Sequence, residues 1–486
     1  MGNSKLGQLF DLFYSLSVIS KITEEFLDIS FGDKRLDCRF KKIADQLSRN
    51  MGASIPLACE DWANTKAAYR FFSNKKITQD KILDPHKLST HNRIKKNPDN
   101  FTLILHDTTE LTYTNHPSIK DLNPGRKFTL RNPKKDGSKT IHYDYNLIMH
   151  TSLALTTAGV PLGITALRIW DRDKLKDTTN LKRKINPTRV PIESKESYKW
   201  IENIDKSSSE SLISSKKLVH IGDRDSDMFE LFELCDKTDT NFVIRVAHNR
   251  NVGLNGELLY DTESHGIIQS GTFDLEVTDS DRTKRIAKIN LSFSKVNIIP
   301  TMSKRNNFTP LTLYYIVAEE VLGKDENPSN PILWRLLTNL PIKSLKSAQE
   351  KIYWYSLRWK IEVFFKVLKT GCKVEDCRLQ TKQGLIRYLT LMSIVSWRIF
   401  WITMFSRENP TGSPKECLTL EEIEILKKVA QKKNSNWKGK TLKDYYYELA
   451  KLGGFLARKS DGGPGFITTW RGYLKLQDII FGFRLI

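Results

Sequence analysis

The chain has 486 residues, of which 39% are hydrophobic and 10% aromatic. This composition excludes a globally disordered protein, and the length suits two to four domains. The 77 Lys and Arg residues outnumber the 56 Asp and Glu residues, which gives a formal net charge of +21. Such an excess indicates a polyanionic partner, and nucleic acid is the first candidate.

The cysteines and the apolar segments exclude two other classes. Only Cys372 and Cys377 are close in sequence, so no second pair completes a zinc site, and we expect six reduced thiols in a cytosolic protein. The N-terminus lacks the pattern of a signal peptide. The most apolar segment, residues 389–405, is interrupted by Arg398 and predicts a buried helix rather than a membrane span.

Residues 1–97 predict a helical DNA-binding domain. Asp33 can cap a helix that runs to Asn50, and further helices are expected at 57–72 and from Thr78 towards Arg93. Short basic helices joined by polar turns are typical of DNA-binding domains, although many helical bundles share this pattern.

Residues 98–408 predict a catalytic core of the α/β class. Strands are expected at 101–106, 145–156, 160–170, 217–222 and 241–246, with helices at 193–205 and 226–235. This order matches the ribonuclease H-like layout, in which a mixed sheet has three antiparallel strands followed by parallel ones.

Three further segments surround this core pattern. Residues 250–340 predict an all-β insertion, with strands at 256–260, 271–277, 286–293, 311–320 and 332–337. Residues 123–140 predict a basic loop that either contacts DNA backbone or is simply solvated. Residues 409–486 are expected to be helical.

Residues 355–369 predict one amphipathic helix with an unusual polar face. Leu357, Ile361, Phe364 and Leu368 form its apolar side. The opposite stripe places one carboxylate among cations and a phenol: Tyr355, Arg358, Glu362, Lys366 and Lys369. Either the stripe is a solvated face of ion pairs, or Glu362 is a metal ligand flanked by phosphate-binding groups.

Two aspartates favour the second reading. Asp107 and Asp223 each follow a predicted strand, at the edge of an open α/β sheet where ligands bind. Together with Glu362 they would make three carboxylates, whose oxygen ligands favour Mg²⁺, with Mn²⁺ as a substitute. Two such ions could activate a water or 3′-hydroxyl for attack on a phosphodiester.

The chain resembles the bacterial insertion-sequence DDE transposases, in the cut-and-paste, Tn-five-like branch. That branch carries the signature Tyr-x2-Arg-x3-Glu-x6-Lys, which Tyr355, Arg358, Glu362 and Lys369 match at every spacing. HDTTEL around Asp107 and IGDRDSD around Asp223 are similar to the first and second catalytic motifs of the family. AYRFFSN at residues 68–74 and WRLLTNLP at residues 334–341 add to a similarity that covers nearly the whole chain.

The resemblance implies metal-dependent excision by strand nicking, hairpin formation and hairpin resolution, followed by joining of the 3′ ends to target DNA. Asp107, Asp223 and Glu362 would be the catalytic metal ligands. The implied DNA contacts are phosphate binding by Tyr355, Arg358 and Lys369, base stacking by Trp334, and further contacts by Arg245 and Arg70.

The resemblance also implies partners and a location. The N-terminal helices would bind double-stranded DNA with terminal inverted repeats, and residues 409–486 would hold a homodimer in the synaptic complex. The protein would be cytoplasmic in a bacterium, bound to the nucleoid and not to a membrane.

Three features depart from the family pattern: a long basic loop after Asp107, Ala247 at a commonly basic position, and an expected short helix at the C-terminus after Gln477. The last of these bears on the dimer contacts. Two alternatives stay open, namely a non-catalytic DNA-binding inhibitor of transposition and a metal-dependent DNA nuclease.

Overall fold

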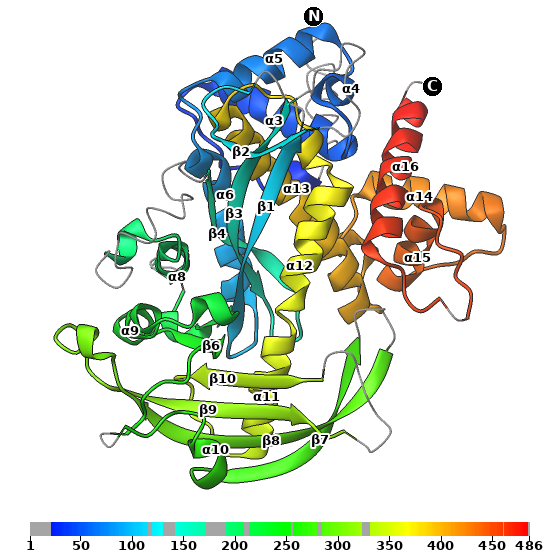
Figure 1. The fold of residues 1–486 in the computed structure, drawn as a ribbon. Coiled ribbons are helices and arrows are strands. Elements are labelled where there is room, and N and C mark those ends of the chain that lie inside the picture. Colours follow the sequence, from blue (N-terminus) through cyan, green and yellow to red (C-terminus); the bar gives the residue numbers. More distant parts are fainter. Residues whose placement is uncertain are drawn as a thin grey trace, which may run out of the picture.

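A ten-stranded mixed sheet with helices on both faces forms the centre of the molecule (Figure 1). The computed structural model describes residues 21–114, 119–129, 141–171, 191–208, 213–253, 256–278, 284–322, 331–459 and 461–484. The expectations for residues 1–20 and for residues 130–140 of the basic loop lie outside this part of the chain.

The N-terminal part is helical, as predicted. Its helices are α2 (Lys21–Glu24), α3 (Lys34–Arg49), α4 (Ile55–Cys59), α5 (Trp62–Ser73) and α6 (Gln79–Lys96). Asp33 caps α3 as expected. The predicted helix 57–72 is instead two helices, because Glu60 has a positive φ of 66° and Asp61 caps a new helix.

The first half of the sheet has the predicted mixed pairing. Its strands are β1 (Thr102–Thr114), β2 (Pro124–Thr129), β3 (Ile141–Leu155), β4 (Pro161–Trp170), β5 (Leu218–Gly222) and β6 (Asn241–Arg245). β3 is antiparallel to both β1 and β4, whereas β5 is parallel to β1 and β6 is parallel to β5.

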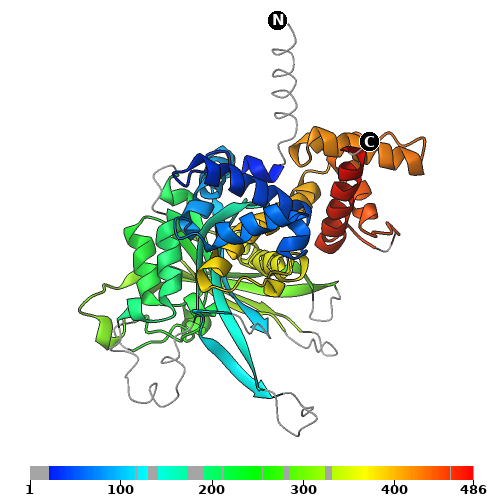
Figure 2. The same ribbon diagram turned by 90° about the horizontal axis from the view of Figure 1, so that it is seen from above.

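Two predictions for this half were wrong in extent. β1 does not end at His106 but continues through Asp107 to Thr114, because it stays paired with β3 and buries Leu111 and Tyr113. Part of the predicted basic loop is strand β2, which pairs with β3. Seen from above, this hairpin, drawn in cyan, projects from the body (Figure 2).

The strands of the insertion extend the same sheet. They are β7 (Gln269–Thr278), β8 (Lys284–Ile298), β9 (Leu311–Glu320) and β10 (Leu333–Thr338), in the spatial order β6-β10-β9-β8-β7. β10 joins them to the core by antiparallel pairing with β6. Residues 256–260 do not form the predicted strand and make only an isolated bridge, and a one-turn helix follows, α10 (Thr262–His265).

Helices cover the two faces of the sheet with separate cores. α8 (Tyr198–Ser208) and α9 (Phe229–Lys237) pack on one face around Trp200 and Phe232. α11 (Leu345–Ser356), α12 (Trp359–Lys366) and α13 (Lys382–Glu408) cover the other. Short 3₁₀ turns connect the elements: η3 (Ile192–Ser194), η4 (Ser215–Lys217), η5 (Arg224–Ser226), η6 (Met302–Lys304), η8 (Val374–Asp376) and η9 (Pro414–Glu416).

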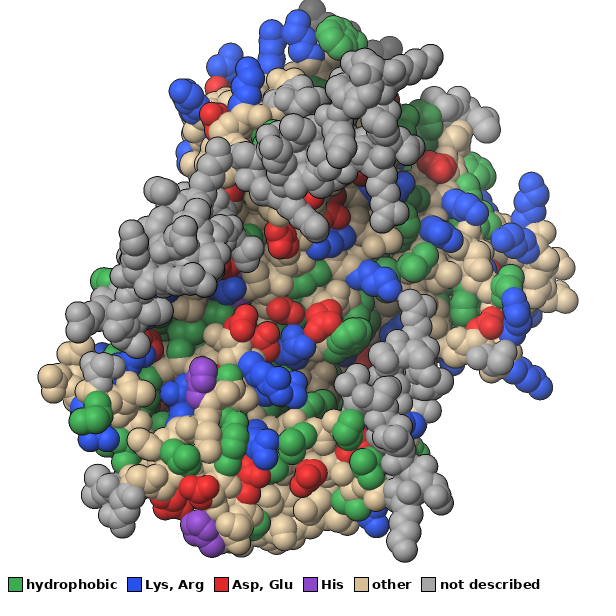
Figure 3. Space-filling view, viewed as in Figure 1, with side chains coloured by type: hydrophobic (Ala, Val, Ile, Leu, Met, Phe, Trp, Pro, Cys, Tyr) green, Lys and Arg blue, Asp and Glu red, His purple; other side chains and the backbone are tan. Residues whose placement is uncertain are grey.

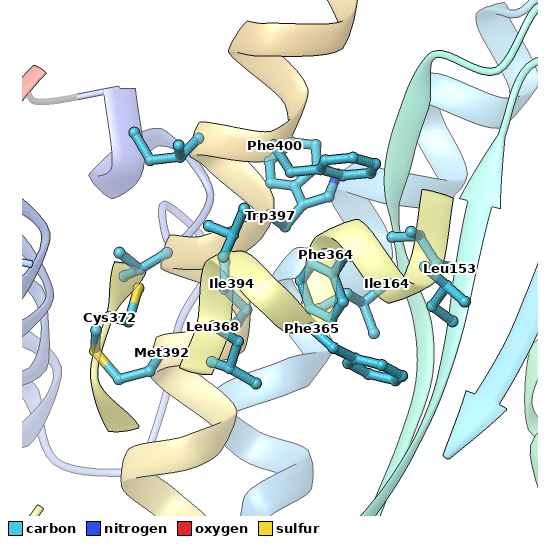
Figure 4. Packing of buried hydrophobic residues seen from close by; sticks show 14 of the residues in the cluster. Leu153, Ile164, Phe364, Phe365, Leu368, Cys372, Met392, Ile394, Trp397 and Phe400 are labelled. Carbon is cyan, nitrogen blue, oxygen red and sulfur yellow. The ribbon is translucent and has the colours of Figure 1, made fainter. Parts of the chain in front are cut away.

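α13 is the buried helix that residues 389–405 predicted. It is apolar and long enough to cross a membrane, but 89% of its most apolar window is buried inside the protein. Met392, Ile394, Trp397 and Phe400 pack against α12 and the residues that follow it (Figure 4). Near its start, the Arg387 guanidinium donates to the carbonyl oxygens of Phe72 and Ile77, at the end of α5 and beyond it.

The C-terminal part is helical, as predicted: α14 (Leu420–Lys433), α15 (Leu442–Leu452) and α16 (Phe466–Arg484). The final helix has 19 residues, so the expectation of a short C-terminal helix was wrong. α15 and α16 cross closely, since a Cβ atom on Gly472 would lie 1.8 Å from the Leu449 carbonyl oxygen. All six cysteines are free, and five of them are buried.

Candidate active site

Asp107 and Asp223 lie level with each other on neighbouring strands. The parallel ladder of β1 and β5 pairs Leu105 with Ile221, and each aspartate is two residues further along the chain. Asp223 follows β5 directly and caps η5, accepting the Asp225 N–H at 2.9 Å. Pairing of β1 with β5 therefore brings the two aspartates level, as predicted, but the prediction that Asp107 ends its strand was wrong, because β1 continues to Thr114.

Glu362 lies on α12, not on one helix spanning residues 355–369 as predicted. α11 ends at Ser356, and i→i+3 bonds at the junction tighten the backbone: Arg358 N–H to Tyr355 O at 3.0 Å and Ile361 N–H to Arg358 O at 3.0 Å. After α12 the chain widens into a π-helical turn, η7 (Val367–Gly371). The apolar residues of α12 pack against α13, which fixes the position of its polar side (Figure 4).

One guanidinium joins two of the three carboxylates. Arg358 Nη1 donates to Asp107 Oδ2 at 3.1 Å and Nη2 donates to Glu362 Oε1 at 2.8 Å. Arg358 therefore lies between the strand carboxylate and the helix carboxylate. Figure 3 shows acidic and basic side chains gathered together at the centre of this face of the molecule.

The site is short of positive charge. The pKa of Asp107 is raised to about 6, because burial and the nearby carboxylates Asp223 and Glu362 outweigh the lowering by Arg358 and the Thr108 N–H. Burial also raises the pKa of Asp223, although Arg358 and Lys199 oppose this effect. Carboxylates crowded in this way need additional cations to stay ionised together.

The donor chemistry fits a divalent ion such as Mg²⁺, which prefers carboxylate oxygens. As their side chains lie, the described residues contain no group of three or more His, Cys, Asp or Glu residues placed to hold a metal ion. Arg358 lies between Asp107 and Glu362 in this arrangement. The side chains of Asp107, Asp223 and Glu362 are thus not arranged around a common metal position here, and their role as metal ligands stays a prediction.

The other members of the predicted stripe have separate positions. Tyr355 is only 4% exposed and packs edge-to-face on Trp334, with ring centroids 5.3 Å apart. Lys369 lies in η7, and its ammonium donates to the Glu110 carbonyl oxygen of β1. Lys366 is exposed, as the solvated-face reading of this residue predicts.

Trp334, which the resemblance assigns to base stacking, is half-buried on β10. A second tryptophan, Trp359, is 64% exposed and directly follows Arg358. Sequence reasoning missed Trp359, although its position next to the signature arginine was a usable signal. The exposed indole of Trp359 offers a flat apolar surface one residue along the chain from Arg358.

Arg245 lines a small basic pocket together with two arginines that sequence reasoning did not select. The pocket, of about 290 Å³, also takes in Arg224, which follows Asp223, and Arg335 of β10. Arg335 is held by Glu263, with an Nε to Oε1 distance of 2.7 Å, and Arg245 donates to the Leu333 carbonyl oxygen at 3.2 Å. Guanidinium groups from three elements make this pocket suited to a phosphate.

The two ends of the motif Asp223–Asp227 have different structural roles. Asp227 has a fully buried side chain that accepts the Ala247 and His248 N–H groups at 2.7 and 2.9 Å and pairs with Arg250 at 2.6 Å. Ala247, where a basic residue is common in the family, therefore contacts Asp227 through its backbone N–H, and this contact does not depend on the side chain at that position. Asp227 fastens the chain after β6, while Asp223 remains at the site.

Histidines support β1 from the opposite face. His106 Nε2 and His220 Nδ1 are 2.9 Å apart, and His150 Nδ1 is 2.9 Å from the Thr108 hydroxyl oxygen. Burial lowers the pKa of all three histidines, so they are neutral at physiological pH. They form a neutral hydrogen-bonded support beside Asp107.

Arg70 does not join this site. It lies exposed on α5, in the N-terminal helical part at the top of Figure 1. The predicted residues thus fall into a central group around the carboxylates and a separate position on the N-terminal helices.

Comparison with known families agrees with this division. Residues 20–77 match the transposase DNA-binding family, and residues 201–398 match the transposase DDE domain. The first match includes α2 to α5 and ends before α6; the second includes Asp223 and Glu362 and begins after Asp107.

The matches support an enzyme that acts on DNA and has its own DNA-binding region. More particularly, they support a DDE-type transposase.

Proposed function

We propose that this protein is a cut-and-paste transposase of the Tn-five-like branch, acting on a bacterial insertion sequence through a ribonuclease H-like core. The observation that carries the proposal is the placement of Asp107 level with Asp223, with Glu362 tied to Asp107 through Arg358. The strand order β4-β3-β1-β5-β6, in which β3 runs antiparallel to the other four strands, supports the ribonuclease H-like assignment.

Asp107, Asp223 and Glu362 would hold Mg²⁺, or Mn²⁺ in its place. A bound divalent ion supplies Lewis-acid activation of a water or a 3′-hydroxyl and stabilises the leaving oxygen. The order of reaction we propose is nicking at the transposon end, hairpin formation on the opposite strand, reopening of the hairpin, and strand transfer into target DNA.

Arg358, Tyr355 and Lys369 would hold a DNA phosphate near the scissile bond, with Arg245 on the backbone nearby. Arg358 has the guanidinium geometry for this contact, since it already holds two carboxylates. Tyr355 is covered by Trp334. The roles of these two residues are therefore linked, because a Trp334 ring that moves to stack on a base would uncover the Tyr355 phenol.

The remaining assignments concern whole regions. Residues 1–97 would bind the terminal inverted repeats, with Arg70 among the contacts, and residues 98–408 would be the catalytic core with the insertion at 250–340. Residues 409–486 would hold the synaptic homodimer. We place the protein in the bacterial cytoplasm, at the nucleoid when bound.

A plasmid cleavage assay tests the proposal. Purified protein is incubated with Mg²⁺ and a plasmid whose marker segment lies between the inverted repeats that flank its own gene. We expect double-strand breaks at the repeats, with hairpin ends on the released segment. Random nicking without hairpins would indicate a nuclease, and binding without cleavage would indicate an inhibitor; either result contradicts the proposal.

A further inference from the structure

One face of α5 presents a tryptophan and two cations to solvent. Trp62, Lys66 and Arg70 are spaced by four residues, so they lie along one side of the helix. All three are exposed, and Trp62 is 77% exposed. The opposite side of α5 is the buried one and carries Thr65, Ala68, Phe71 and Phe72.

A second large apolar side chain lies on the preceding helix. Leu57 of α4 is 69% exposed, and only the short turn of Glu60 and Asp61 separates α4 from α5. Basic side chains and a hydrophobic patch stand out together at the top of Figure 3, over α5. Leaving a leucine and a tryptophan in water costs free energy that burial against a partner recovers.

The position of α5 is fixed at both ends. Asp61 caps its start by accepting the Asn64 N–H at 2.7 Å, and Arg39 of α3 donates to the Asn64 side-chain oxygen at 3.0 Å. At its end, Arg387 holds the Phe72 carbonyl oxygen. The exposed face is therefore a rigid surface, and Trp62 is its first residue.

We propose that Trp62, aided by Leu57, reads thymine methyl groups in the major groove of the terminal repeat, while Lys66 and Arg70 contact the DNA alongside. The proposal rests on the proposed function. Thymine alone among the bases displays an apolar methyl group in the major groove, and the first residues of a recognition helix are those that reach base edges. The two cations on the same face suit the polyanionic backbone.

Thymine-to-uracil replacement tests this contact, because it removes only the methyl group. Binding of the full-length protein to a duplex of its flanking inverted repeat is measured by fluorescence anisotropy, with uracil at one thymine position at a time. We expect one or two positions at which uracil weakens binding by about fourfold, the factor that corresponds to one buried methyl-sized group.

Trp62→Ala should weaken binding to the thymine duplex and remove the difference between thymine and uracil at those positions. Trp62→Phe should retain part of it, since an apolar ring remains. Ile286→Ala is the matched control, because Ile286 is also a large exposed apolar residue (74%) but lies on β8; it should retain the full discrimination. Lys66→Gln should weaken binding equally for all duplexes and reduce the salt dependence.

Two results would overturn the proposal. One is wild-type binding that does not respond to uracil at any thymine, and the other is a Trp62→Ala protein that still discriminates. If Trp62→Ala instead changes only the self-association of the protein, the surface is a contact between copies. Failure of the proposed function would look different, since the wild-type protein would then either not prefer the repeat to unrelated DNA or bind it without cleaving the plasmid.

Discussion

Two ion clusters in this protein, one buried and one half-buried, have opposite electrostatic character. At the first, Glu25 accepts bonds from His86 Nδ1 at 2.6 Å and from Arg93 Nη1 at 2.7 Å. Burial raises the pKa of Glu25, but His86 and Arg93 together lower it to about 2. At the second, burial and neighbouring carboxylates raise the pKa of Asp107 to about 6 despite Arg358.

The difference lies in the ratio of donors to carboxylates. His86 Nε2 accepts the Ile164 N–H at 3.0 Å, which leaves Nδ1–H to donate to Glu25, and Arg93 adds two further donors. In the candidate active site, one guanidinium serves both Asp107 and Glu362, and Asp223 is close enough to add to the repulsion. The first cluster is electrostatically complete and joins helices to β4, whereas the second has capacity for further cations.

The largest effect that we expect from changing a residue of either cluster is on catalysis, at the candidate active site. Glu362→Gln removes a proposed metal ligand and should reduce plasmid cleavage by about 1,000-fold or more. DNA binding should persist, because Glu362 lies outside the matched DNA-binding region. Cleavage gels and anisotropy with the repeat duplex measure the two activities. Glu424→Gln, an exposed change on α14, is the control; a comparable loss of binding in Glu362→Gln would mean that this residue is structural.

The next largest effect should be on stability, at the complete cluster. Glu25→Gln leaves His86 and Arg93 without their buried anion and should lower the free energy of unfolding by about 3 kcal/mol. Urea denaturation at pH 7.5 measures the change, with Asp28→Asn as an exposed control. The pKa of Glu25 is lowered on folding, so its contribution is present above about pH 4.5 and is lost as the pH falls towards 2. An unchanged denaturation midpoint would show that the cluster contributes no stability.

A smaller effect of opposite sign is expected at Asp107. Its pKa is raised on folding from 3.8 to about 6, so the protein loses stability as the pH rises through this window and the carboxyl ionises. Asp107→Asn removes this cost and should stabilise the metal-free protein by about 1–3 kcal/mol at pH 7.5, with no gain below pH 3.8.

Thermal unfolding in the presence of EDTA measures this gain. Adding Mg²⁺ should then raise the melting temperature of the wild-type protein but not that of Asp107→Asn, since binding to the native state stabilises it. Glu424→Gln should respond to Mg²⁺ as the wild-type protein does. If Asp107→Asn were less stable than the wild-type protein at pH 7.5, ionised Asp107 would stabilise the fold as Glu25 does, and the proposed difference between the two clusters would be wrong.

Sequence patterns predicted an element correctly where residues within that one strand or helix determine its structure. The strands around Val219 and Val243 are short apolar runs, and Asp33 is a clear helix cap, so these elements were placed within a few residues. The alignment of Asp107 with Asp223 was also predicted, because each aspartate follows an apolar run and these two runs pair as neighbouring parallel strands.

Sequence patterns failed where pairing between distant segments decides the structure. The polar run after Asp107 suggests a strand end, yet β1 continues because β3 pairs with it as far as Thr114. Nothing local indicates that β10 will pair with β6, which makes the insertion part of the central sheet. The break at Leu357 and Arg358 was also missed, since the apolar spacing runs through it unchanged.

The anchoring of α5 by Arg387 sets an order of events during synthesis. The guanidinium binds carbonyl oxygens that lie 310 and 315 residues earlier in the chain. The N-terminal helices are synthesised long before α13. They therefore lack their final packing partner while the residues of the intervening sheet are being translated. The region matched to DNA binding can therefore reach its finished packing only after the segment that carries Glu362 has been translated.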